Sequence, residues 1–141
     1  MDTNKKVAVT LIRLLLGLIF LMQGYGKVFT YGVENLYNMD FFHGTYKDLL
    51  PDFVTRGTAY FTSYTELIAG FLLTVGLLRD YALYALAAVL VVVTFGHGLA
   101  EPIWDLSHVM FRTILLLALL LLPSQWDCYG LDSLLQQKRS A

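Results

Sequence analysis

The side chains that could do chemistry in this chain lie within strongly apolar stretches. They are one carboxylate, two cations, two imidazoles and an amide: Gln23, Lys27, Glu66, His97, His108 and Arg112. A charge near the centre of a bilayer costs about 2.5–3.5 kcal/mol, so in a membrane each should face the protein interior and find a partner. Together they offer hydrogen-bond donors, acceptors and groups that carry protons.

Their spacing predicts that they meet. Gln23 and Lys27 are four residues apart and share a helix face, as do His108 and Arg112. With a helix starting near Thr58, Glu66 lies about 12 Å along it at 1.5 Å per residue. We expect all these groups at one level, in the outer half of the molecule.

The elements that must position them are four apolar stretches, 7–29, 58–78, 81–99 and 106–122. Each is near the ~20 residues that cross ~30 Å of hydrocarbon, and 57% of the 141 residues are hydrophobic. Only Arg79 and Asp80 separate the second stretch from the third, and a short segment broken by Pro102 separates the third from the fourth, so these neighbours must be antiparallel. The sequence predicts an all-α membrane protein, one domain over 1–141, built as a bundle of four transmembrane helices in the lipid bilayer.

The link from Tyr31 to Phe53 mixes aromatic and charged residues. Rings with polar edges favour the headgroup zone, which indicates an interfacial segment with a short helix between the first two helices. The alternative is a lid over a site below.

Positive charges set the orientation. Lys and Arg residues cluster on the side of the two termini, which predicts that both termini are cytoplasmic. Arg13, near that side, is expected to extend to the surface. The polar tail after Pro123 is expected to be a solvated end.

The polar cluster has three interpretations. It could be a satisfied network that only fixes helix order. It could be a metal site of His97, Glu101, Asp105 and His108, but two histidines eleven residues apart match no standard ligand motif, and nearby cations would oppose a metal. We therefore expect no metal.

The third interpretation is a ligand pocket reached from the lipid. A quinone would suit it, because its carbonyls accept hydrogen bonds from Lys27, Arg112 or a histidine, while Glu66 or a histidine carries protons. We expect the six residues named first to bind such a ligand, with no covalently bound cofactor.

The cysteine count and the net charge limit the partners that the chain can have. The single cysteine, Cys128, excludes an internal dithiol relay, so electron transfer would need a separate redox protein. A net charge of -1 gives no case for nucleic acid. Transport would need a homo-oligomer, since four short helices leave little room for alternating access.

The segments RLLLGLIFLMQGYGKVF and ELIAGFLLTVGLLRDYALYALAAVL resemble the DoxX-like family over the first three helices. The residues on that pattern are Arg13, Gln23, Gly24, Lys27, Glu66, Gly70, Gly76 and Arg79. Many relatives carry histidine where Gln23 stands, so a role that needs a titrating ring does not carry over. The resemblance implies a four-helix bacterial inner-membrane protein. Some relatives look like membrane subunits of thiosulfate:quinone oxidoreductases, and others are linked to oxidative-stress complexes or membrane-protein assembly.

The leading hypothesis is a quinone- or lipid-interacting membrane subunit of a redox system. The alternative is a non-catalytic scaffold or assembly factor whose polar network is structural and whose working surface is the aromatic link. Whether the chain is an enzyme stays open.

Overall fold

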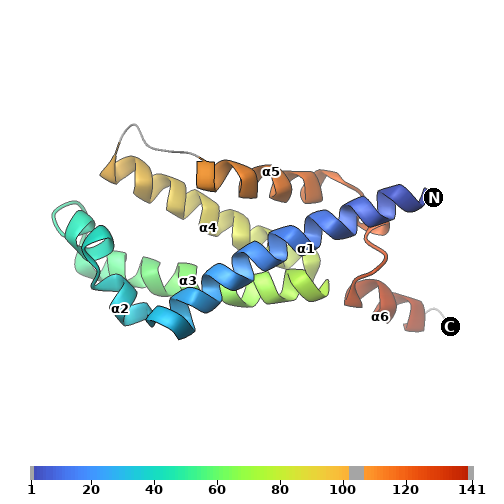
Figure 1. The fold of residues 1–141 in the computed structure, drawn as a ribbon, viewed down its shortest axis with the longest axis horizontal. Helices are drawn as coiled ribbons and strands as arrows, with labels where there is room; N and C mark the ends of the chain where they lie inside the picture. Colours follow the sequence, from blue (N-terminus) through green and yellow to red (C-terminus); the bar gives the residue numbers. More distant parts are fainter. Residues whose placement is uncertain (1, 102–106, 140–141) are drawn as a thin grey trace.

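The computed structural model describes residues 2–101 and 107–139, and the described residues form helices and no strand (Figure 1). The prediction of an all-α protein is confirmed. The elements in chain order are α1 (Thr3–Tyr25), the π-helical turn η1 (Gly26–Tyr31), α2 (Val33–Tyr37), the π-helical turn η2 (Asp40–Gly44), α3 (Asp52–Val75), α4 (Arg79–Ala100), α5 (Ser107–Leu121), the 3-10 turn η3 (Ser124–Trp126) and α6 (Leu131–Arg139).

The long helices α1, α3, α4 and α5 run alternately up and down the molecule, so both termini lie at one end and α2 at the other (Figure 1). They share one apolar core that includes Leu16, Phe20, Leu73, Leu86 and Leu119, each fully buried. Most other large apolar side chains on these helices are exposed, as expected for a surface that faces lipid.

Two described helical stretches are long and apolar enough to cross a membrane, residues 3–31 and Arg79–Ala100. The helix α5 is apolar but shorter, and α3 is more polar at its start. That start differs from the prediction, because α3 begins at Asp52 rather than near residue 58. Its end comes earlier than residue 78, because Gly76 has a φ of 71° and breaks the helix.

The first and third helices approach closely at glycines. A Cβ on Gly24 would lie 2.3 Å from the backbone nitrogen of Leu67, and one on Gly70 would lie 2.4 Å from that of Leu21. Each glycine thus admits the backbone of the facing helix, as small residues do in membrane proteins. This close contact brings Lys27, just beyond the end of α1, within reach of Glu66 on α3.

The aromatic link folds back over the outer end of α3. The side chains of Val33, Leu36 and Tyr37 in the short helix α2 are buried. The Tyr37 hydroxyl donates a hydrogen bond to Asp52, the first residue of α3, and Nδ1 of His43 lies 2.9 Å from the same hydroxyl. The link therefore contains a short helix, as predicted, and it is anchored to the start of α3.

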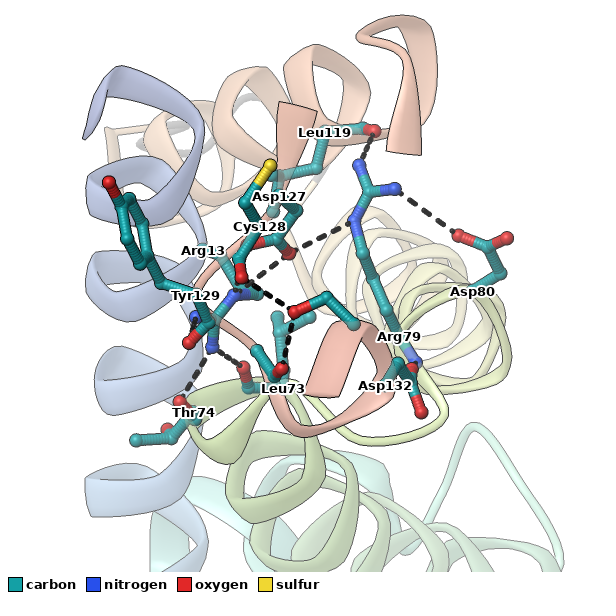
Figure 2. Close-up of polar contacts among 12 residues, drawn as sticks. Arg13, Leu73, Thr74, Arg79, Asp80, Leu119, Asp127, Cys128, Tyr129 and Asp132 are labelled. Atoms are coloured by element: carbon teal, nitrogen blue, oxygen red, sulfur yellow. Dashed lines mark hydrogen bonds and ion pairs between the residues drawn. The ribbon is translucent and has the colours of Figure 1, made fainter. Parts of the chain in front are cut away.

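Two expectations about the end that holds the termini were wrong. Arg13 does not extend to the surface, because it is 1% exposed and its Nε lies 2.9 Å from Oδ2 of Asp127. Nor is the tail simply solvated, since its residue Asp127 is buried and faces Arg13 (Figure 2). The same arginine donates to the carbonyl oxygens of Leu73 and Thr74 at 2.8 and 2.7 Å.

Arg79, at the start of α4, joins this cluster from the other side. Its guanidinium donates to the carbonyl oxygen of Leu119, and its Nε lies 3.7 Å from Oδ2 of Asp127 (Figure 2). Its backbone N–H donates to Asp132 of α6 at 3.1 Å. One buried carboxylate thus serves two arginines and holds the tail against α1 and α4.

Candidate functional site

The polar residues singled out in the sequence surround one cavity at the end of the molecule opposite the termini. The cavity has a volume of about 840 Å³. Its lining includes all six predicted ligand-binding residues, Gln23, Lys27, Glu66, His97, His108 and Arg112. Four helical segments that are distant in the sequence contribute these residues. The expectation that the six side chains lie at one level of the molecule agrees with this arrangement. Their role in binding stays a prediction.

An ion pair links the first and third helices across the cavity. Lys27 on η1 places Nζ 2.6 Å from Oε2 of Glu66 on α3. The Glu66 side chain is 1% exposed, so its charge needs this partner. Its second oxygen, Oε1, is buried and accepts no hydrogen bond from the described residues.

A second pair joins the first and fifth helices. Arg112 donates from one terminal nitrogen to Oε1 of Gln23 at 2.7 Å and from Nε to the carbonyl oxygen of His108. Its guanidinium carbon also lies 5.5 Å from the ring centroid of Phe20, within the range of a cation–π contact. The predicted helix faces are therefore correct: Gln23 and Lys27 both point to the cavity, as do His108 and Arg112.

The two histidines meet edge to face, with their Nε2 atoms 3.4 Å apart. Of the alternative metal ligands, Glu101 is exposed and does not line the cavity, and Asp105 lies outside the described residues. Within residues 2–101 and 107–139, no group of three His, Cys, Asp or Glu side chains is arranged to hold a metal ion.

Aromatic side chains of the link form the outer wall of the cavity. Phe42 and Tyr46 pack with ring centroids 5.8 Å apart, and both line the cavity together with Phe41. Tyr46 also reaches α4, where its hydroxyl would lie 3.5 Å from a Cβ placed on Gly96. Burial raises the pKa of Tyr46, which keeps its hydroxyl protonated and able to donate. The link thus lies where the lid interpretation would place it, over the cavity.

Sequence reasoning missed a polar stripe on α3. Thr55, Thr58 and Thr62 line the cavity above Glu66. Their spacing of three and four residues, continued to Glu66, is typical of one helix face and was readable from the sequence. Apolar side chains such as Leu50 and Val54 complete the lining.

The result is a mixed site. Most of the wall is apolar or aromatic, and a few polar side chains from four helical segments share it, as in pockets for small organic ligands. Such a wall suits a molecule with an apolar body and a head that forms hydrogen bonds.

Comparison with known protein families places residues 8–98 in the DoxX family. Comparisons with curated proteins and with solved structures gave no match. The matched region runs from α1 to near the end of α4, so it contains Gln23, Lys27, Glu66 and His97, whereas His108 and Arg112 lie beyond it. Because the match covers more than half of the chain, and the helices are apolar, this is a membrane protein of the DoxX family.

Proposed function

We propose that the protein is a membrane subunit of a redox system and binds a quinone- or lipid-like molecule in the cavity. The observation that carries this proposal is that all six polar side chains line one largely apolar cavity. Quinone carbonyls there would accept hydrogen bonds from Lys27 or Arg112, and Glu66 or a histidine would exchange protons.

The proposal includes the membrane arrangement. All four long helices, α1, α3, α4 and α5, cross the bacterial inner membrane as an antiparallel bundle with both termini in the cytoplasm. The aromatic link then lies in the outer interface, where it covers the cavity as a lid. The position of both termini at one end of the molecule supports this topology (Figure 1).

A separate redox protein would supply or accept the electrons. The single thiol, Cys128, lies in the tail and does not line the cavity. The chain itself thus offers a docking site for the ligand, and a partner at the membrane surface completes the reaction. A homo-oligomer is compatible with this role.

One observation favours a second function, a non-catalytic scaffold or assembly factor. The pairs Lys27–Glu66 and Arg112–Gln23 join side chains of different helices, as the polar contacts of a structural network do. Phe41 of the link is 61% exposed and could contact another protein.

Native mass spectrometry of the protein released from mild detergent tests the first proposal. We expect a retained organic molecule of quinone or lipid mass, lost in Glu66→Gln and kept in Asp48→Asn, a matched change of an exposed carboxylate. A bare protein mass would count against the pocket. A complementation assay separates the two functions, since a scaffold tolerates Glu66→Gln whereas a ligand-binding subunit does not.

A further inference from the structure

The short helix α6 in the tail carries its apolar side chains on the face that points away from the protein. Leu131, Leu134 and Leu135 are three and four residues apart, so they share one side of the helix, and they are 43–52% exposed. A surface helix in water packs its apolar side on the core and leaves its polar side outside. The leucines of α6 therefore lie where only an apolar medium or a partner would cover them.

The polar side of α6 is the side that holds the helix to the protein. Asp132 and Ser133 line a hollow of about 590 Å³ together with Arg79 at the start of α4. The backbone N–H of Asp132 donates to the carbonyl oxygen of Gly76 at 2.9 Å, and its carboxylate accepts from the backbone N–H of Arg79 at 3.1 Å. Turning α6 to bury its leucines would break these hydrogen bonds, so the apolar side stays outside.

The exposed apolar surface of the long helices continues to this end of the molecule. Tyr81 in the first turn of α4 and Leu121 at the end of α5 are exposed, and so is Tyr129 just before α6. The helix α6 lies at the same end, together with both termini (Figure 1). Tyrosine favours the headgroup level of a bilayer. When the long helices cross a membrane, α6 is thus next to the membrane surface.

The charges at this end identify the kind of surface that fits. Lys138 is exposed and follows Leu134 by four residues, so it lies on the leucine side of α6. Lys5 is also exposed, and its Nζ lies 5.1 Å from the ring centroid of Trp126 in the tail. The carboxylates of Asp127 and Asp132 are bound to arginines of the protein itself. Exposed lysines beside an apolar helix face suit the anionic headgroups of phospholipids.

We infer that α6 is an interfacial helix that inserts Leu131, Leu134 and Leu135 into the bilayer surface and binds anionic phospholipid through Lys138. This inference rests on the proposed membrane arrangement of the four long helices. It goes beyond the proposed function, because it assigns a lipid-binding surface at the end of the molecule opposite the cavity.

The depth of nitroxide spin labels in the full chain tests the inference. In a Cys128→Ser background, single labels are attached through Leu134→Cys, Leu135→Cys and Gln136→Cys in nanodiscs of phosphatidylcholine and phosphatidylglycerol. Collisions with oxygen, which concentrates among acyl chains, are compared with collisions with a water-soluble nickel chelate. We expect the oxygen-to-nickel ratio to be several-fold higher at positions 134 and 135 than at position 136, on the polar side.

A label through Ile114→Cys on the exposed side of α5 separates the inference from its premise. If that label meets nickel as freely as oxygen, the proposed membrane arrangement itself fails. If it lies in lipid while positions 134 and 135 meet nickel as often as position 136, the leucines face water and the inference is overturned. Shielding of positions 134 and 135 from both reagents would also overturn it, because a second copy or another protein would then cover the face.

The part of Lys138 is tested on the label at position 134. We expect Lys138→Glu, or nanodiscs of phosphatidylcholine alone, to raise nickel collisions there several-fold, because the helix loses its attraction to anionic headgroups. Lys47→Glu, the same change at an exposed lysine of the link, should leave the collisions unchanged. Equal collisions in all of these samples would overturn the binding of anionic phospholipid.

Discussion

Arg13 and Asp127 are 114 residues apart in the chain, and their side chains form a buried ion pair with Nε 2.9 Å from Oδ2. Both side chains are less than 5% exposed. Arg79 approaches the same carboxylate at 3.7 Å. The end of the molecule that holds the termini is thus tied together by a charge cluster, and the opposite end holds the cavity lined by Glu66.

This cluster predicts an order of destabilisation. Asp127→Asn removes the carboxylate from two buried arginines and should cost about 3–5 kcal/mol of unfolding free energy. Arg13→Met should cost less, because Arg79 still faces Asp127. Asp80→Asn serves as a control, since its side chain is 58% exposed and such pairs contribute about 0–1 kcal/mol. Unfolding titrations in mixed micelles measure all three, and equal losses would contradict the assignment.

The glycine contacts between α1 and α3 predict a second set of stabilities. Gly24→Ala or Gly70→Ala places a Cβ within 2.5 Å of backbone on the facing helix, which must move away. We expect a loss of about 1–3 kcal/mol, as for overpacking in cores. Gly98→Ala is the matched control, because nothing lies within 4 Å of its Cβ and alanine favours a helix. Thermal unfolding in detergent gives the comparison, and a loss in Gly98→Ala equal to that in Gly24→Ala would argue against close packing.

The anchor of the link predicts a dependence on alkaline pH. The hydrogen bond to Asp52, and then burial, raise the pKa of Tyr37 above its ordinary value of 10.0. The neutral phenol is thus favoured in the folded state, so its contribution to stability is complete below pH 10 and is lost as pH rises through the folded pKa.

Ultraviolet titration of the phenolate measures this shift, with Tyr37→Phe subtracted to isolate one ring. We expect Asp52→Asn to lower the midpoint of Tyr37 toward 10. A midpoint that does not move in Asp52→Asn would show that the hydrogen bond is not its cause.

The proposed topology predicts which residues are reached from outside the cell. In a Cys128→Ser background, Asp48→Cys on the link should react with a membrane-impermeant maleimide in intact spheroplasts. Lys138→Cys on α6 should react only after permeabilisation. The opposite pattern would place the termini outside and reverse the proposed orientation.

The sequence predicted the helices and the cavity residues for one physical reason. Charged groups such as Glu66 and Arg112 are so costly among apolar residues that they must converge, and helical spacing then selects the shared faces. The position of the link over the cavity was harder to predict from the sequence. Its short helix was predicted, but its contacts with Asp52 and α4 depend on packing between distant segments.

The cluster around Arg13 could not be predicted by the same reasoning. A single arginine near a helix end is compatible with exposure to the headgroups, because its long side chain can reach them. Only the folding back of the tail makes burial favourable, and the signal in the sequence was one aspartate, Asp127, in an otherwise ordinary polar segment. Pairings over such distances leave no periodic pattern.

The Arg13–Asp127 pair also has a consequence for the order of biosynthesis. The arginine emerges first and its carboxylate follows 114 residues later, a delay of roughly 6–23 s at about 5–20 residues per second. During that interval the newly inserted α1 carries a cation without its counter-ion. A segment translated after all four long helices therefore supplies the counter-ion of α1.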